Sequence, residues 1–379
     1  MMSIIPTTTS TTQNSAAVGE KELKQPVRNQ YERLNTSEDD LGHGNQEEDP
    51  GCCTCLICCF GCLSLCGCRD WVCRKLVFFP PHCQYMVQVE IKEKGLSSVM
   101  KQHVMYIRDE TGRFSDPHGG AHFKVYMVPT KRRQKICTIF IRNPDAKSTF
   151  LISHGNATDL GLLRNHLLEL SMVLDVNVYA YDYTGYGLST NSGRPTVRDC
   201  LADIEAAFQH LTNVIGIKEK DVILYGQSLG TGPTLHLARK HPAVRAVVLH
   251  SGIMSGLRVI RPFLKDSYWF DIFPNVDIIR ECKSPIFVIH GMQDEEIDIL
   301  HGRQLYAKSA QKIAPWWVDG GGHNDIEFQT RGLYFQKLKN FLNEVGGGEK
   351  KESSGTMTPK RENEKVVIQD QVLPIDRKS

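Results

Sequence analysis

The sequence lacks an excess of charge of either sign. Lys plus Arg number 45 and Asp plus Glu number 43, so the formal net charge over 379 residues is only +2. A protein that wraps a nucleic-acid backbone needs a strongly basic surface, and this composition supplies none. Hydrophobic residues still make up 41% of the chain, which is enough to bury a large core. We therefore expect a folded protein without a nucleic-acid partner.

Targeting signals are also missing from both ends of the chain. The N-terminal stretch has no apolar core of the kind that a secretory signal needs, which favours a reducing compartment. The chain starts with Met-Met, not Met-Gly, and ends in Asp-Arg-Lys-Ser, so neither end predicts myristoylation or prenylation. Any membrane contact is expected to come from a segment inside the chain.

Cysteine is scarce over most of the sequence, and the composition divides the chain into four regions. Ten of the thirteen cysteines lie between Cys52 and Cys83, which excludes a disulfide framework for the whole protein. The acidic, polar N-terminal region and the C-terminal region without aromatics cannot bury enough apolar surface to offset the entropy cost of ordering. We therefore expect a disordered arm at 1–50, a cysteine-rich segment at 51–83, a folded domain at 84–346 and a disordered tail at 347–379.

The folded domain alternates strand patterns with helix patterns. Segments 86–94, 123–128 and 136–141 predict strands that open the domain as an antiparallel meander. Later strand segments are continuous apolar runs, typical of parallel strands buried on both faces; they are 149–153, 176–183, 221–226, 246–251, 285–290 and 315–320. Helices are expected at 160–174, 196–211, 229–240, 300–310 and 326–344. The pattern predicts an α/β domain with a mostly parallel sheet and helices on both faces.

The motif that carries chemistry is Gly226-Gln227-Ser228-Leu229-Gly230. It follows a predicted buried strand and precedes a predicted helix, the context in which a tight turn exposes a nucleophilic serine. The flanking glycines are needed because side chains there would collide within the turn. The same pattern also occurs as a plain glycine-rich turn in which the serine only caps the helix. The strand and helix around it favour the nucleophile.

A serine hydroxyl needs a base that takes its proton and an acid that orients the base. In this fold class the chain order is serine, acid, histidine, with the last two in loops after later strands. Asp294 follows the strand at 285–290 most closely, with Asp298 in reserve and Glu295 and Glu296 as competitors. His323 lies in the glycine-rich loop after the last predicted strand. The sequence therefore predicts Ser228, Asp294 and His323 as the catalytic residues.

A tetrahedral oxyanion needs two backbone N–H donors. Leu229, the residue after the nucleophile, is expected to supply one donor at a helix N-terminus. The second is expected from the loop after the strand at 149–153, where Asn156 is favoured and Ala157 is the alternative. This chemistry requires neither a cofactor nor a metal.

Five ordered blocks resemble the α/β-hydrolase domain-containing protein 17 family of membrane-attached acyl-protein thioesterases. They are SHGNATDLG (153–161), YDYTGYG (181–187), GQSLGTGPT (226–234), HGMQDEEID (290–298) and GGGHNDIE (320–327). The resemblance implies an α/β-hydrolase fold over about 84–345 and places the family's nucleophile, acid and base on Ser228, Asp294 and His323. It also implies palmitate on N-terminal cysteines and S-palmitoylated proteins as substrates.

Residues 51–68 are uncharged and combine apolar side chains with eight cysteines: Cys52, Cys53, Cys55, Cys58, Cys59, Cys62, Cys66 and Cys68. A zinc site is disfavoured because the cysteine pairs overlap and the residues between them are apolar. Disulfides are disfavoured because the expected compartment is reducing. A transmembrane span is disfavoured because the run is short and contains several glycines. Multiple S-acylation is favoured, because each buried methylene adds about 0.8 kcal/mol of membrane affinity. We expect a lipid-anchored peripheral protein on the cytoplasmic face of membranes, at the plasma membrane and endosomes.

The connection between residues 251 and 285 is too short for a large cap domain, so a protein surface could approach the serine. Its apolar residues either line an acyl groove or pack a helix on the sheet; they are Ile253, Met254, Leu257, Phe263, Trp269 and Phe270. The favoured function is removal of S-linked palmitate from membrane-associated proteins. A lipid or small-ester hydrolase with the same triad, and a non-catalytic membrane-anchored binding module, are the alternatives.

Overall fold

The computed structural model describes residues 61–62, 65, 75, 77–93, 99–108, 113–115, 123–189 and 195–346. All of them belong to one of the two units into which the chain divides, Ile57–Ser379. The predicted arm and tail lie outside the described residues, as do seven of the eight predicted acylation sites. The eighth, Cys62, is described and is exposed.

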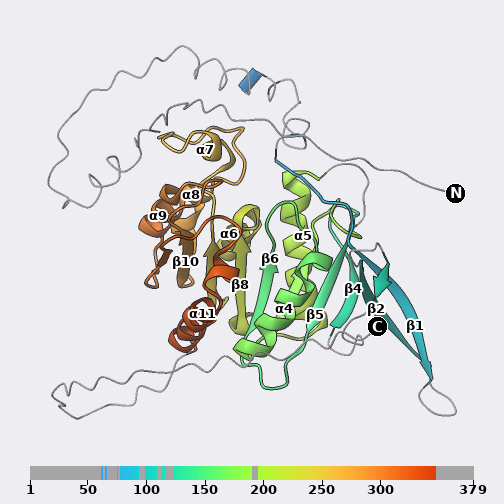
Figure 1. Ribbon diagram of the computed structural model, residues 1–379. Helices are drawn as coiled ribbons and strands as arrows, with labels where there is room; N and C mark the ends of the chain where they lie inside the picture. The colour runs from blue at the N-terminus through green and yellow to red at the C-terminus, as the bar shows by residue number, and fades with distance from the viewer. Residues whose placement is uncertain are drawn as a thin grey trace, which may run out of the picture. The chain divides into compact units, whose positions relative to one another are not determined.

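An eight-stranded sheet forms the centre of the domain, in the order β11-β10-β9-β8-β6-β7-β5-β4 (Figure 1). Its strands are β4 (Phe123–Pro129), β5 (Lys135–Ile141), β6 (Thr149–Ser153), β7 (Asn177–Tyr181), β8 (Val222–Gln227), β9 (Ala246–His250), β10 (Ile286–Gly291) and β11 (Trp316–Val318). Strands β4, β5 and β7 pair antiparallel, and every other neighbouring pair is parallel. The continuous apolar runs are indeed buried along their whole length in β6, β7, β9 and β10.

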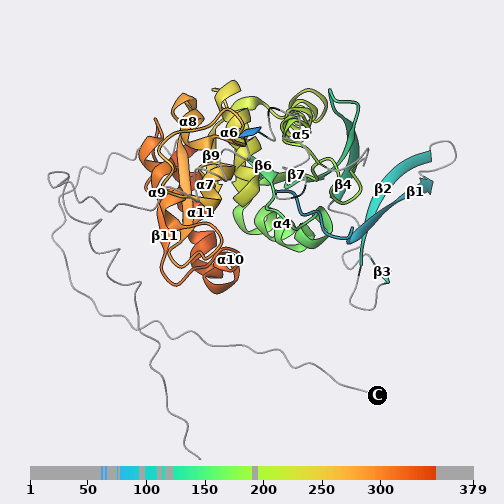
Figure 2. The ribbon, with the colours of Figure 1, turned by 90° about the horizontal axis from the view of Figure 1, so that it is seen from above.

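Helices cover both faces of this sheet (Figure 2), which confirms the predicted fold class. The α-helices are α4 (Leu160–Leu174), α5 (Val197–Gln209), α6 (Thr231–Lys240), α7 (Gly256–Ile260), α8 (Asn275–Ile278), α9 (Ile299–Lys308), α10 (Ile326–Gln329) and α11 (Arg331–Val345). Short helical turns are η2 (His210–Val214), η3 (Glu219–Asp221), η4 (Ser228–Gly230) and η5 (Ile279–Glu281). Helices α5, α6 and α8 lie on one face, and α4 and α11 lie on the other.

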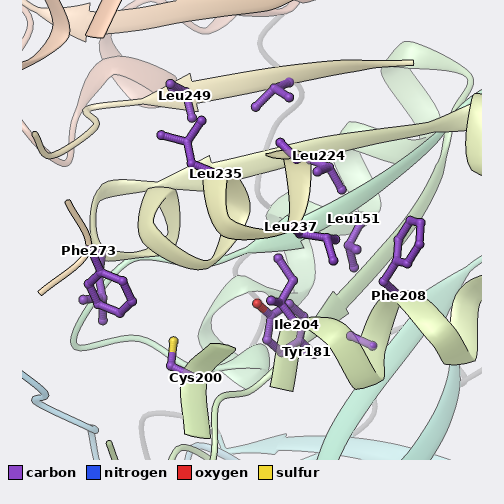
Figure 3. Close-up of a cluster of buried hydrophobic side chains, with 14 of the residues drawn as sticks. Leu151, Tyr181, Cys200, Ile204, Phe208, Leu224, Leu235, Leu237, Leu249 and Phe273 are labelled. Carbon is purple, nitrogen blue, oxygen red and sulfur yellow. The ribbon is translucent and has the colours of Figure 1, made fainter. Parts of the chain in front are cut away.

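The hydrophobic core accordingly consists of two clusters, one on each face of the sheet. The first packs α5 and α6 on the strands through side chains such as Ile204, Phe208, Leu235 and Leu237 (Figure 3). The second packs α4 and α11 on the opposite face. Because the strands are buried on both sides, their backbone is held rigidly, and the loops that leave them start from fixed positions.

Several helices that follow the sheet strands are capped by side chains at their starts, among them α4 and α5. Asp159 caps α4, with its side chain accepting a hydrogen bond from the backbone N of Leu162. Thr196 caps α5 by accepting from the backbone N of Asp199, at the predicted helix start. Such caps satisfy N–H groups that have no partner within the helix.

The predicted opening meander is wrong in its first strand. Strand β1 (Tyr85–Glu93) pairs with β2 (Val99–Arg108), and β3 (Phe114–Ser115) completes a separate three-stranded sheet. Only β4 and β5 pair as the meander required. The alternating pattern of residues 86–94 predicted a strand correctly, but an alternating pattern does not specify the partner.

The connection between β9 and β10 is short, as predicted, and contains only α7, α8 and η5. Within the described part of the chain, no helix combines the length and apolarity required to span a bilayer.

Candidate active site

Ser228 lies in a tight turn between β8 and α6 and has a φ of 48°, in the left-handed region. The glycines on either side leave no room for a side chain. A Cβ on Gly226 would lie 2.8 Å from the backbone O of Gly230, and one on Gly230 would lie 2.1 Å from the backbone O of Ser153. The turn therefore brings Ser228 and the end of β6 together through backbone contacts that only glycine permits.

The structure brings Ser228, His323 and Asp294 together, although they are far apart in sequence. The His323 Nε2 atom lies 2.9 Å from the Ser228 Oγ, and its Nδ1 atom lies 2.7 Å from the Asp294 Oδ2. Asp294 follows β10 and His323 follows β11, and these strands are parallel neighbours. The side chains of His323 and Asp294 are almost wholly buried. This is the arrangement in which a carboxylate orients an imidazole toward a hydroxyl.

Asp294 is held as a carboxylate by its surroundings. Its Oδ1 accepts hydrogen bonds from the backbone N of Glu296 (3.0 Å) and of Ile297 (2.7 Å). Burial by itself raises the pKa of the Asp294 carboxyl, but hydrogen bonds from His290 and His323 outweigh it and hold that pKa below its usual range. The carboxylate is therefore charged when His323 needs it.

The other acidic candidates occupy different positions. The Asp298 side chain caps α9 by accepting from the backbone N of Leu300 at 2.7 Å. The Glu296 carboxylate lies 3.8 Å from the His323 Nε2 but is largely exposed, and it accepts from the Asn324 side chain. Glu295 is exposed. Of these acids, Asp294 alone bonds to the Nδ1 of His323.

The loop after β6 lies against the nucleophile. A Cβ on Gly155 would lie 3.9 Å from the Ser228 Cβ, so the backbone approaches the serine closely at this point. Leu229 is buried at the start of η4, directly after the serine. The oxygen and the nitrogen of the Asn156 side chain both form hydrogen bonds with protein atoms. Ala157 has a φ of 52°, an unusual value for a residue with a side chain.

The apolar residues of the 251–285 connection divide into two groups. Ile253, Met254 and Phe270 are buried in the fold, whereas the Phe263 and Trp269 side chains are 84% and 62% exposed. Leu257 is half-buried. Packing explains the first group, so of the six predicted residues Phe263 and Trp269 are the ones that expose most of their apolar surface, and Ile260 of the same connection is also 62% exposed.

Sequence reasoning missed two residues of the site. The Nε2 of His290, at the end of β10, lies 3.4 Å from the Asp294 Oδ2 and 2.8 Å from the backbone O of Ile297. Tyr186 donates from its hydroxyl to the Asn156 Oδ1 at 2.7 Å. Their positions in HGMQD and YDYTGYG beside the site's loops were the available signal. Among the described residues, no group of three His, Cys, Asp or Glu side chains is placed to hold a metal ion.

A serine in a strained turn after a buried parallel strand, with a histidine and an acid from the next loops, defines the α/β-hydrolase class. Comparison with known proteins agrees. A family model described as "Serine aminopeptidase, S33" matches residues 144–272. An esterase from Pyrococcus furiosus shares the fold with a TM-score of 0.50 at 17% identity, over 59% of this chain and 91% of that chain.

Relatives in sequence define the family. α/β-hydrolase domain-containing protein 17B of Homo sapiens is 38% identical over 290 residues, which cover 76% of this chain and 96% of that protein. Protein 17C of Mus musculus is 43% identical over 220 residues, which cover 58% of this chain and 67% of that protein. The chain belongs to the α/β-hydrolase domain-containing protein 17 family and is a hydrolase.

Proposed function

We propose that this hydrolase removes S-linked palmitate, or a similar long acyl chain, from membrane-associated proteins. The observation that carries the proposal is the hydrogen-bonded chain from Ser228 through His323 to Asp294. A serine placed in this way can attack an acyl carbonyl, and a cysteine thiol is a good leaving group because its pKa is only about 8.5.

The reaction proceeds in two halves. In the first, the Ser228 Oγ bonds to the thioester carbonyl carbon while His323 takes the serine proton at Nε2. The backbone N–H groups of Leu229 and Asn156 donate to the oxyanion. The carbon–sulfur bond then breaks, and the thiolate takes the proton from His323 and leaves as a thiol.

The second half regenerates the enzyme. Water attacks the acyl-serine, and His323 takes a proton from the water as it does so. The carbon–oxygen bond to Ser228 breaks, the serine recovers its proton from the imidazolium, and the fatty acid is released. Asp294 stays ionised throughout and stabilises the charged imidazole, consistent with its lowered pKa.

Membrane attachment through S-acylated cysteines is the second part of the proposal. Cys62 is exposed and so is accessible to an acyltransferase. Gly61 lies against the Phe270 ring, since a Cβ on Gly61 would be 3.4 Å from the Phe270 Cε1. The exposed Trp269 ring packs edge-on against Phe270, so it offers apolar surface near Gly61 and Cys62. A membrane-bound enzyme of this kind would meet lipidated proteins on the same surface.

Release of palmitate from an S-palmitoylated peptide tests the activity. Wild-type protein is expected to release the fatty acid, and Ser228→Ala is expected to lose the activity by at least about 10³-fold. Asn213→Ala, which changes an exposed side chain, is the matched control. The same peptide with an O-palmitoyl serine separates thioesterase from esterase. Faster cleavage of the ester than of the thioester would replace this proposal with a lipid or ester hydrolase.

Acylation has its own test. Thioester-specific exchange labelling is expected to mark the region 52–73, and replacing those cysteines with serine is expected to release the protein from membranes. Membrane retention by the serine variant would contradict the anchoring proposal.

A further inference from the structure

The side chain of Asn156 ties the loop beside the nucleophile to the point where the chain enters the domain. Its Nδ2 donates to the backbone O of Val77 at 2.6 Å, and its Oδ1 accepts from the backbone N of Phe79 at 3.0 Å. The same Oδ1 also accepts from the Tyr186 hydroxyl at 2.7 Å and from the Ala157 backbone N at 3.1 Å. One amide thus bridges segments about eighty residues apart in sequence.

The segment Val77–Phe79 is well placed to hold this loop. Phe78 is 3% exposed and belongs to the same core cluster as Tyr183, Tyr186 and Leu229. The backbone of Val77 and Phe79 on either side of that buried ring supplies two of the four hydrogen-bond partners of the Asn156 amide. A buried anchor with a polar contact before and after it fixes the segment in position and in rotation.

The loop needs such support. Ala157 adopts a φ of 52°, and a non-glycine residue persists in that region only where the surroundings determine its conformation. Two backbone N–H groups that stabilise an oxyanion must already be in place when the charge forms, and a displacement of about 1 Å can cost about 100-fold in rate. The atoms that keep the Asn156 backbone in place are therefore part of what sets the rate.

We infer that Val77–Phe79 is a positioning element of the oxyanion hole and that it acts through the Asn156 side chain. The inference rests on the proposed function, in which the Asn156 backbone N–H is an oxyanion donor. It assigns a role in turnover to residues within the cysteine-rich segment (51–83), so a change in how that segment is held would change the rate of the chemical step.

The test removes the two ends of this contact separately and together, in the full-length protein with a water-soluble S-octanoyl cysteine peptide as substrate. Asn156→Ala is expected to lower kcat by about 10- to 100-fold, with KM and the melting temperature little changed. Phe79→Pro removes the N–H donor, and its kcat is expected to lie about tenfold below that of Phe79→Ala, which keeps the donor. The double variant Asn156→Ala, Phe79→Pro is expected to be no slower than Asn156→Ala, because both changes break the same contact.

Two results would overturn the inference: equal kcat for Phe79→Pro and Phe79→Ala, or a double variant whose loss is the product of the single losses. If Phe79→Pro does not fold, phenyllactic acid at position 79 replaces the N–H with an ester oxygen and keeps the side chain, and the same comparison applies. Failure of the proposed function is distinguishable, because the wild-type protein would then cleave the O-acyl serine peptide faster than the S-acyl cysteine peptide, whatever the ratio of kcat between the two Phe79 variants.

Discussion

The turn that carries Ser228 and the loop that carries Asn156 lie against each other, yet different contacts hold them. The turn is fixed by backbone packing around two glycines, within a few residues of the serine and against the end of β6. The loop is fixed by side-chain hydrogen bonds to Val77, Phe79 and Tyr186, which are remote in sequence. A short motif can encode the first arrangement, whereas the second exists only after the whole domain has folded.

The loop that carries Asp294 resembles the turn of Ser228, because contacts within a few residues hold it. A substitution of Asp294 is expected to have the largest effect on activity. Asp294→Asn is expected to lower kcat by about 10⁴-fold, because an amide cannot hold the His323 Nδ1–H in the required tautomer. Steady-state turnover of the S-palmitoyl peptide measures this loss of kcat. Asp298→Asn is the control: asparagine caps a helix as well as aspartate, so the capped start of α9 and the rate are both expected to persist. A larger loss from Asp298→Asn than from Asp294→Asn would reassign the acid.

Breaking the turn itself is expected to have the next largest effect. In Gly230→Ala the new Cβ would lie 2.1 Å from the Ser153 backbone O, so the serine and the loop after β6 must move apart. We expect at least about a 100-fold loss of kcat together with a lower melting temperature. Gly332→Ala is the matched control, because a Cβ at Gly332 meets nothing within 4 Å. Alanine is expected to stabilise α11 by about 0.5–1 kcal/mol relative to glycine. Wild-type activity in Gly230→Ala would show that the turn is not held as described.

The smallest expected effect concerns a buried acid that bonds to the loop of Tyr186, a hydrogen-bond partner of Asn156. Asp203 accepts from the backbone N and the hydroxyl of Thr184, two residues before Tyr186, and burial raises the pKa of its carboxyl to about 7. The folded state therefore binds this proton more tightly than the unfolded state. Its contribution to stability is greatest below a pH of about 4 and is lost as the pH rises toward 7.

Asp203→Asn removes this titration and can still bond to both groups of Thr184. Denaturant unfolding across this pH range is expected to show a smaller fall in the free energy of unfolding for the variant than for the wild type. Parallel pH profiles of the two proteins would contradict the raised pKa.

The sequence predicted the sheet and most of its helices, because buried parallel strands leave continuous apolar runs that are easily read. Ser228, Asp294 and His323 were predictable for a related reason: each follows such a strand directly, so strand order alone brings the loops to one edge of the sheet. The pairing of β1 with β2 was not predictable, since the pattern of residues 86–94 fits any antiparallel partner.

The contacts that support the site escaped sequence reasoning because they join remote residues. The Tyr85 hydroxyl, at the start of β1, donates to the Asp182 carboxylate after β7. The Asn156 side chain likewise bonds to the backbone O of Val77. No spacing in the sequence encodes either contact. The contact of His290 with Asp294 is local by comparison, because the turn after β10 brings together two residues that are four positions apart.

The central claim is that Ser228 carries the acyl group between the two halves of the reaction. Full-length protein mixed rapidly with an excess of S-palmitoyl peptide and quenched with acid can be digested and analysed by mass spectrometry. The account predicts a palmitoyl group on the peptide that contains Ser228, formed at least as fast as palmitate is released and absent from Ser228→Ala. Release of palmitate with no acyl group on Ser228, or with the group on another residue, would contradict it.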